Sequence, residues 1–404
     1  MNLKLIFSLL LVTLTMAACT SDMESDIDQM QSSVINELIG NKDSEEFANN
    51  CMSRVFPRTR GTDLEVEDVQ LYVPRKTRAQ NPAEKGMDTI VAVNYAYNKG
   101  FVMYGKKKGL KKMIAIAEEG RFQFADTAFN RGLKFYIKNL CAHDVEFLSL
   151  AVAKEPEITK HPPVLNQNVR NWDQISPYNC FCPSLWCSAN NRYEHAYVGC
   201  VPLSVGMVMT HYEWPNANGS VSFDWQTIKS NPYSYINGDY AYRSIASLVF
   251  TLGSQDNLKT TYGVAPEGSP TQRKNVIPVL KKWGYSAPGD WSDDWPYKYV
   301  SGKEEERKPI LICGTDKDNP SEGHQWVVDG SMYVDHFENN NNTVTHTDRY
   351  LYFIWGWGGL SNAYYLAGST TPNYGWTDKP FGQSVSNTAS FVNLVYYGDF
   401  TPNK

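Results

Sequence analysis

The chain has 404 residues, a formal net charge of −5 and a sequence pI of about 5.9. Its 42% hydrophobic and 13% aromatic residues are enough for a sizeable core, and its length predicts two folded units rather than one. Lysine and arginine are scattered along the chain, so we expect no nucleic acid among the partners.

The first residues are typical of an export signal. Lys4 precedes an apolar run that is short for a membrane span and ends at Ala18-Cys19. We expect residues 1–18 to be removed and Cys19 to become a lipidated N-terminus, which anchors an exported bacterial protein at the outer membrane or cell surface until activation releases it. Ordinary signal-peptidase cleavage after Ala18, which gives a secreted product, is the alternative. The acidic residues 19–40 are expected to form a solvated tether.

Residues 41–153 have the pattern of a small α+β unit. A helix is expected over Ser44–Val55, and Thr89–Tyr104 has the pattern of a β-hairpin that turns at Asn98–Gly100. Apolar residues at helical spacing follow between Asp126 and Leu140. Strand pairs followed by a helix therefore predict one small mixed unit.

Residues 154–164 are polar, proline-rich and without apolar periodicity, which predicts a linker to a second unit over residues 165–404. Proteolysis concentrates at exposed segments without buried hydrogen bonds, so we expect activating cuts between about Ala142 and Pro163. An ordered strap that is never cut is the alternative.

Three cysteines lie close together in the chain, at Cys180, Cys182 and Cys187. No fourth ligand follows at a zinc-site spacing, so neither a metal nor another cofactor is expected. In an exported protein a disulfide is favoured, most simply between Cys187 and Cys180 or Cys182. Three free thiols are the alternative.

Cys200 is the candidate nucleophile. It follows Gly199 and opens an apolar pattern at helical spacing, which predicts that it lies in the first turn of a mostly buried helix. The positive end of the helix dipole favours a thiolate there. A cysteine at a helix start is also commonly a packed small hydrophobic residue, so a catalytic interpretation needs a partner.

His324 is the candidate partner, because it follows Gly323 and begins an apolar run with strand character. Neither His195 nor His211 is well placed as a base. The cysteine precedes the histidine, and their separation is close to the roughly 130 to 150 residues typical of papain-like enzymes.

The rest of the second unit is expected to be helical first and strand-rich later. Helical periodicity runs over 240–252 and 272–283, and strands are expected from Pro309 onward. Residues 350–365 have the pattern of two strands joined by a glycine-tryptophan turn, whose Trp355 and Trp357 would wall a site. His336 and His346 flank a polar run that is expected to form an exposed hairpin tip.

Taken in order, three of these segments resemble the streptopain-like family of secreted bacterial cysteine peptidases. The family has Gly-Cys-Val at the nucleophile, Gly-His-Ala-Phe/Trp-Val-x-Asp-Gly at the histidine and Asn-Trp-Gly-Trp-Gly-Gly after it. The corresponding segments here are Gly199–Val201, Gly323–Gly330 and Ile354–Gly359, and further similar segments are Trp172–Asn179 and Phe223–Trp225. The resemblance covers nearly all of residues 165–400.

The resemblance implies an α+β fold, a papain-like two-part catalytic domain with a helical half and an antiparallel sheet half. It also implies that residues 41–153, where Tyr-x-Tyr-Asn, Gly-Phe-Val and a terminal helix come in the family's order, form an inhibitory pro-domain removed during activation. The expected function is a cysteine endopeptidase that cleaves proteins or peptides.

In that reaction His324 would deprotonate Cys200, the thiolate would attack the peptide carbonyl, and water would release the acyl-enzyme. The resemblance suggests that Gln174 serves an oxyanion hole with the backbone N–H of Cys200. An ordinary turn residue before Pro177 is the alternative interpretation of Gln174.

The chain departs from the family pattern at two places. Pro202-Leu203-Ser204 stands where the family has Ala-Thr-Ala, and a proline is tolerated near a helix start. Ile354 stands where the family has asparagine, so a backbone carbonyl or packing against Trp355 or Trp357 would have to orient His324. A surface binding protein that kept the fold and lost turnover is therefore the second hypothesis, against which the presence of both Cys200 and His324 speaks.

Overall fold

The computed structural model describes residues 42–57, 64–74, 87–142, 155–287, 297–316, 323–337, 343–370, 391–397 and 400–403. The predicted signal peptide, Cys19 and the acidic tether lie outside these residues and stay predictions. Within the described ranges, no helix combines the length and the apolar character needed to cross a membrane.

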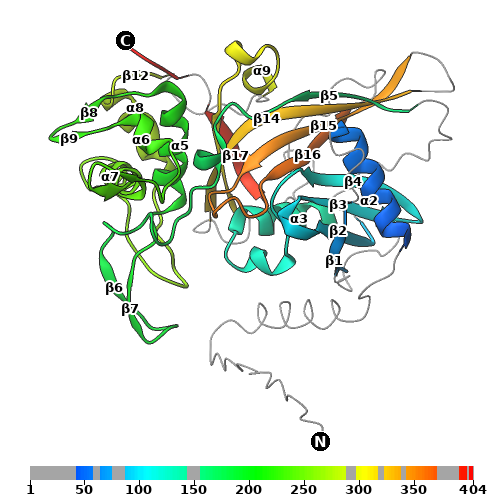
Figure 1. Cartoon of the computed structure of the whole chain (residues 1–404), viewed down its shortest axis with the longest axis horizontal. Helices are drawn as coiled ribbons and strands as arrows, with labels where there is room; N and C mark the ends of the chain where they lie inside the picture. The colour runs from blue at the N-terminus through cyan, green and yellow to red at the C-terminus, as the bar shows by residue number, and fades with distance from the viewer. Residues whose placement is uncertain are drawn as a thin grey trace, which may run out of the picture.

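A helical half and an antiparallel sheet half lie side by side, as predicted (Figure 1). The ten-stranded sheet runs in the order β1-β2-β3-β4-β16-β15-β14-β13-β17, and β5 pairs with part of β14. Its strands are β1 (Val66–Tyr72), β2 (Thr89–Tyr95), β3 (Phe101–Lys107), β4 (Leu110–Ala117), β5 (Glu157–His161), β13 (Ile310–Asp316), β14 (Gly323–Phe337), β15 (Val344–Ile354), β16 (Ala363–Thr370) and β17 (Phe391–Tyr397).

The N-terminal unit packs a helix on each face of its strands. Alternate residues of β2 point to opposite faces, so Val91 and Val93 join the core beneath α2 (Lys42–Val55), whereas Ile90 and Ala92 join the core beneath α3 (Arg131–Ala142). The predicted helix and hairpin are confirmed, and the predicted helix after Asp126 is α3 preceded by the 3-10 turn η4 (Phe124–Ala128).

The sheet continues from the N-terminal unit into the C-terminal unit. β4 pairs with β16 through Ala115 with Tyr365 and Ile116 with Tyr364. As a result α3 covers the same face of the sheet as Trp326, Phe353 and Trp355, with which its apolar residues share one core.

Residues 157–161 of the predicted linker are ordered, as in the alternative of an ordered strap. They form β5, which pairs with β14 through Ile158 with Val334 and Thr159 with Tyr333. Ile158 packs against the core beneath α2, which gives this polar segment an apolar contact that holds it in place. Residues 143–154 lie outside the described ranges, so the positions of activating cuts stay a prediction.

The helical half is built around α5 (Cys200–Tyr212), whose residues 201–210 are all buried. α7 (Ala241–Gly253) confirms the first predicted helix, and η5 (Arg273–Asn275) with α8 (Val276–Lys282) confirms the second. The remaining elements are η3 (Ala96–Asn98), α4 (Gln167–Arg170), β6 (Ser184–Cys187), β7 (Arg192–His195), β8 (Ala217–Asn218), β9 (Val221–Ser222), α6 (Trp225–Ile228), β10 (Tyr235–Ile236), β11 (Asp239–Tyr240), β12 (Tyr285–Ser286), α9 (Tyr297–Val300), η6 (Glu304–Glu306) and β18 (Thr401–Pro402).

The predicted disulfide in the cysteine-rich segment is wrong, because Cys180, Cys182 and Cys187 are all free thiols. Cys187 is buried on β6, where its sulfur lies 3.6 Å from the carbonyl oxygen of Ala265. Cys182 is buried beside Tyr262, and burial raises the pKa of its thiol to about 12. The two buried thiols thus have different neighbours.

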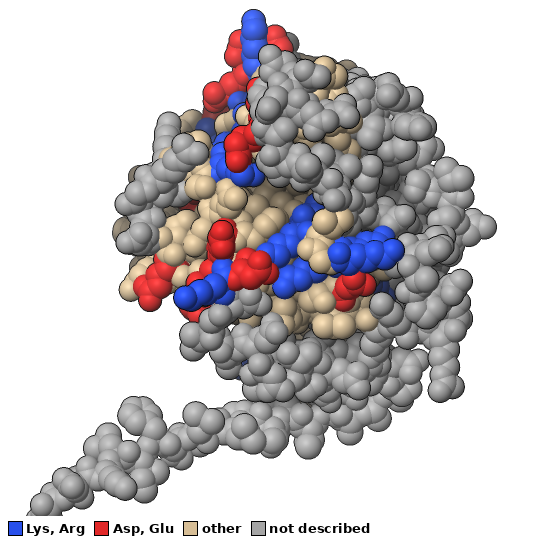
Figure 2. Space-filling view, turned by 90° about the vertical axis from the view of Figure 1, so that its right-hand side faces the viewer, with Lys and Arg blue, Asp and Glu red and all other residues tan. Residues whose placement is uncertain are grey.

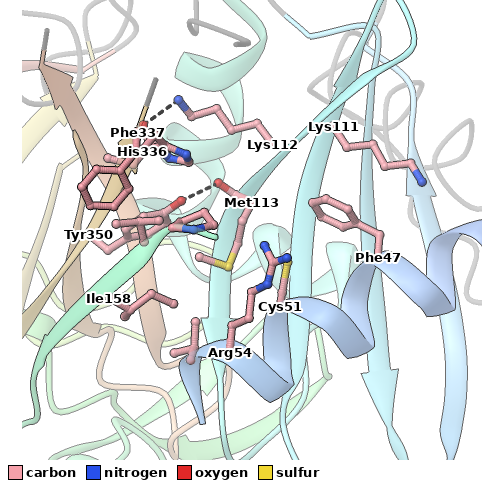
Figure 3. A pocket seen from close by; sticks show the side chains of 14 residues that line it. Phe47, Cys51, Arg54, Lys111, Lys112, Met113, Ile158, His336, Phe337 and Tyr350 are labelled. Carbon is pink, nitrogen blue, oxygen red and sulfur yellow. Dashed lines mark hydrogen bonds and ion pairs between the residues drawn. The ribbon is translucent and has the colours of Figure 1, made fainter. Parts of the chain in front are cut away.

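His336 and His346 do not belong to a surface tip. The tip residues 338–342 lie outside the described ranges, but His346 is 1% exposed, and both imidazoles bind the buried carboxylate of Asp348. A pocket of about 260 Å³ opens beside them, between α2 and β4 on one side and β5, β14 and β15 on the other (Figure 3). Lys112 reaches Asp348 from β4.

Charges of both signs are mixed on the face beside α2 (Figure 2). Lys111 pairs with Asp43, and Arg54 pairs with Glu155. At these positions opposite charges therefore lie side by side on this face.

Candidate active site

Cys200 is the first residue of α5, and Gly199 sets its position. Gly199 has a φ of 93°, and a Cβ at this residue would lie 2.7 Å from the carbonyl oxygen of Ser269. Both the backbone conformation and the space therefore require glycine. The helix that follows is enclosed by the core, which fixes the thiol at the surface of the helical half that meets β14.

The pKa of the Cys200 thiol is raised above its ordinary value in this conformation, in spite of its place at a helix start. Burial raises the pKa of the thiol, whereas the backbone N–H of Gln325 and the charge of Arg131 lower it by less. Loss of hydration disfavours the thiolate more strongly than these groups and the helix end favour it.

His324 is the second residue of β14 and is 6% exposed. Its Nε2 lies 3.2 Å from the carbonyl oxygen of Trp355, and its ring stacks on Trp326 with an interplanar angle of 18°. Burial lowers the pKa of the imidazole to about 4, so the ring is neutral near pH 7. Because a carbonyl can only accept, Nε2 carries the proton and Nδ1 keeps its lone pair.

Cys200 and His324 lie on two elements that pack against each other, α5 and β14, but the two side chains are not in contact. In the described residues no hydrogen bond connects the thiol with the imidazole. The ring instead lies on the α3 side of the sheet, where a Cβ on Gly132 would be 2.7 Å from its Cδ2 and 2.5 Å from Cζ3 of Trp355. The first turn of α3 therefore covers the imidazole directly.

Gln174 lies beside the segment that leads into Cys200. Its carbonyl oxygen accepts a hydrogen bond from the backbone N–H of Val198 at 2.9 Å, and the residue is 4% exposed. Its side-chain Nε2 has no hydrogen-bond partner among the described residues. A buried amide donor thus lies beside the segment that leads into Cys200.

Trp355 and Trp357 lie on the turn between β15 and β16, as predicted, and differ in their surroundings. Trp355 is buried, and its backbone N–H donates to Asn362 Oδ1 at 3.1 Å, which fixes the carbonyl that faces His324. Trp357 is half-buried between two edge-on rings, Tyr197 at 6.1 Å and Phe129 at 5.2 Å. Phe129 comes from the N-terminal unit and covers this indole.

Ile354 is fully buried and pairs with Val327, on the face of the sheet that packs against α5. The ring of His324 lies on the opposite face with Trp326. In this conformation an asparagine at position 354 would therefore not reach the imidazole, and the carbonyl of Trp355 takes the place of such a partner.

Reasoning from the sequence missed two residues that hold the histidine. Gly132 permits the close approach of α3, and Asn362 fixes the backbone of Trp355. Asn362 follows a glycine-rich turn, a place where asparagine is common for conformational reasons, so the sequence held no specific signal. Gly132 lies within a helical pattern. An isolated glycine there indicates a packing contact, but the sequence does not show which residue the glycine contacts.

A thiol at the start of a buried helix, joined to a histidine strand across a two-part fold, places the protein in the class of cysteine peptidases with papain-like architecture. The model of the Peptidase C10 family matches residues 172–365. Over these residues the chain is similar to this family of streptopain-like cysteine peptidases.

Two relatives have comparable stretches of sequence. The thiol protease/hemagglutinin PrtT of Porphyromonas gingivalis is 24% identical over 333 residues, which are 70% of this chain and 34% of that protein. Streptopain of Streptococcus pyogenes serotype M1 is 21% identical over 323 residues, which are 69% of this chain and 75% of that protein. The chain thus spans about a third of the first relative and three quarters of the second.

Among solved structures, the prointerpain A fragment of Prevotella intermedia is similar with a TM-score of 0.45 and 17% identity, over 81% of this chain and 98% of that one. The active interpain A cysteine protease of the same organism is similar with a TM-score of 0.36 and 18% identity, over 51% of this chain and 86% of that one.

Proposed function

We propose that the protein is a cysteine endopeptidase in which Cys200 is the nucleophile and His324 the general base. The observation that carries this proposal is a thiol at the start of α5 together with a neutral imidazole on the adjoining strand β14, whose Nδ1 keeps its lone pair. The substrates are proteins or peptides, and the reaction needs no cofactor.

In the reaction Nδ1 of His324 takes the thiol proton, and Sγ of Cys200 attacks the carbonyl carbon of the scissile peptide bond. The resulting oxyanion accepts hydrogen bonds from Nε2 of Gln174 and the backbone N–H of Cys200. The C–N bond breaks as the imidazolium returns its proton to the leaving amine. Water, deprotonated by the same imidazole, then hydrolyses the thioester.

The N-terminal unit, proposed to be residues 41–153, acts as an intramolecular inhibitor. α3 covers the imidazole at Gly132, and Phe129 covers Trp357, which we propose as a wall of the substrate cleft. Arg131 also lowers the pKa of His324, which disfavours the imidazolium that the reaction requires. Cleavage within residues 143–164 and departure of α3 would let the ring turn toward the thiol. The peptidase unit would then be residues 165–404.

Two further parts of the proposal concern orientation and location. The carbonyl of Trp355 orients His324 in the role that asparagine has in the family motif. The protein is exported and anchored to the membrane through lipid on Cys19, and release follows activation. This location is supported by the apolar leader and its Ala18-Cys19 exit.

The alternative of a binding protein without turnover is not favoured. The feature of the sequence that favoured this alternative was Ile354 in place of the family's asparagine. Ile354 packs toward α5, and His324 has the carbonyl of Trp355 as its hydrogen-bond partner. Cys200 and His324 are both present, and α5 and β14, which carry them, pack against each other.

Replacing the nucleophile tests the proposed function. Cys200→Ala should abolish hydrolysis of a fluorogenic peptide and, if maturation is autocatalytic, leave the full-length precursor on a gel. Cys180→Ala is the matched control, because this cysteine is also a free, partly buried thiol of the helical half. Peptide hydrolysis by Cys200→Ala at the rate of the control would end the assignment of the activity to this residue.

A further inference from the structure

The strand that carries His324 presents its next residue, Gln325, to the other side of the sheet. Side chains alternate along a strand, so His324 and Trp326 face α3, whereas Gln325 and Val327 face α5. Gln325 is 2% exposed and lies where β14 packs against the nucleophile helix. Its amide is thus a polar group in a largely apolar contact.

The side chain of Gln325 is connected to Cys200 through one hydroxyl group. Gln325 Nε2 donates to Ser204 Oγ at 2.8 Å, and this hydroxyl donates to the carbonyl oxygen of Cys200 at 2.7 Å. The backbone N–H of Gln325 also interacts with the Cys200 thiol. Gln325 is therefore linked through Ser204 to the carbonyl of Cys200.

Stability alone does not account for an amide at this position. Gln325 Oε1 is buried and has no hydrogen-bond partner among the described residues. A buried unpaired acceptor destabilises the fold, whereas methionine would fill a similar space without one. The amide instead makes one directional hydrogen bond, which fixes the position of β14 relative to α5.

We propose that Gln325 and Ser204 are positioning residues, which hold the first turn of α5 and the start of β14 in one register so that the Cys200 thiol and the His324 imidazole can meet. This inference rests on the proposed function. Proton transfer between the two groups requires hydrogen-bonding distance, and a misplacement of about 1 Å is enough to slow such a step substantially. None of the hydrogen bonds of the bridge involves the N-terminal unit, so departure of α3 leaves the bridge in place.

The test compares Gln325→Met, Ser204→Ala and the double variant with a control on the same helix. Thr210→Val is that control, because Thr210 is a buried hydroxyl that donates within α5, to the carbonyl of Met207 at 2.6 Å. Each variant is made as the full chain and processed by tagged wild-type protein, which is then removed. kcat, KM, melting temperature and the pH midpoint of Cys200 alkylation are measured, the last by peptide mass mapping.

Each single variant should lower kcat by about fivefold, the factor that corresponds to one buried hydrogen bond, with little change in KM. The double variant should be no slower than the slower single variant, because both changes break the same bridge. Ser204→Thr, which restores the hydroxyl, should recover kcat. The melting temperature of Gln325→Met should be unchanged or higher, and the alkylation midpoint should move to higher pH.

The proposal is overturned if Gln325→Met and Ser204→Ala match Thr210→Val in kcat and in alkylation midpoint, or if their effects multiply in the double variant. Ser204→Ala removes a single atom, so it tests the bridge even where Gln325→Met folds poorly. Failure of the proposed function looks different, because the wild-type protein itself would not hydrolyse peptides. In that case the alkylation midpoints are measured on the unprocessed chains, in which the bridge is also present, since they require no turnover.

Discussion

His324 is kept neutral by the same burial that keeps it away from Cys200. Its pKa of about 4 in the folded chain lies below the ordinary value of 6.5. Between these two pH values the unfolded chain binds a proton that the folded chain does not. The free energy of unfolding therefore falls as the pH is lowered through this window.

This linkage predicts that His324 makes its own contribution to the pH dependence of the free energy of unfolding. The contribution of His324 to this loss of stability should approach a limit on the order of 3 kcal/mol as the pH falls from 6.5 to 4. His211, whose pKa burial also lowers to about 4, adds a loss of the same sign that does not depend on His324. Asp329, whose pKa burial raises to about 6, acts in the opposite direction. Comparing denaturant unfolding of the wild type and His324→Gln cancels the Asp329 contribution. The wild type should lose more stability, and equal losses in the two proteins would contradict the account.

At this scale the sequence indicated the proposed reactive residues more clearly than the residues that hold them. Cys200 and His324 were recognisable because each follows a glycine and opens a regular apolar pattern in the order of a known family. The role of the Trp355 carbonyl was foreseen only as one of two options. Asn362 and Gln325 act through contacts between segments far apart in the chain, and no local pattern reports such contacts.

Among the elements, α3 links the N-terminal unit to the site. Its Gly132 is not needed for an unusual backbone conformation but for space, since a Cβ would clash with the rings of His324 and Trp355. The amphipathic pattern predicted a helix here, and the structure adds that its first turn is pressed onto the imidazole.

Gly132→Val should therefore loosen α3 and speed activation. A side chain forced into this contact costs about 1–3 kcal/mol, part of which shifts the precursor toward its open form. Conversion of the precursor on a gel should be faster, and hydrogen exchange in α3 should rise. Lys138→Val places the same side chain on the exposed face of the same helix and serves as the control. Gly132→Val converting no faster than Lys138→Val would show that α3 does not limit access to the site.

β5 shows where reasoning from composition failed for a whole element. Its polar, proline-flanked sequence lacked apolar periodicity, yet residues 331–335 of the neighbouring strand β14 lie beyond the pairing with β13 and bind β5. Pairing with an available strand can order a segment that local propensity leaves undecided. The two predicted helices after Tyr240 were correct because their periodicity is local.

Across the whole molecule, the two predicted units are joined by a shared sheet and a buried ion pair. Lys112 Nζ of β4 lies 2.7 Å from Asp348 Oδ1 of β15, and both side chains are less than a tenth exposed. Lys112, His336 and His346 together hold the pKa of Asp348 well below its usual range, although burial opposes this. Neither the ion pair nor the β4–β16 pairing was predictable, because both connect residues more than two hundred positions apart.

Lys112→Met should lower the free energy of unfolding of the full chain by about 3 kcal/mol, because it leaves a buried carboxylate with only its two histidine partners. The neighbouring Lys111→Met is the control. Lys111 pairs with the mostly exposed Asp43, so its loss should cost at most about 1 kcal/mol. Denaturant unfolding of both variants measures the difference. A Lys112→Met protein as stable as Lys111→Met would mean that this ion pair does not hold the two units together.

The central claim is that Cys200 is a catalytic thiol which the N-terminal unit keeps inactive. Its most direct test is to treat the full-length precursor and the processed protein with a peptide epoxide that alkylates activated cysteines, and to map the adducts by mass spectrometry. We predict an adduct on Cys200 in the processed protein and little or none in the precursor. Equal labelling of Cys200 in both forms, or labelling of other cysteines instead, would contradict the account.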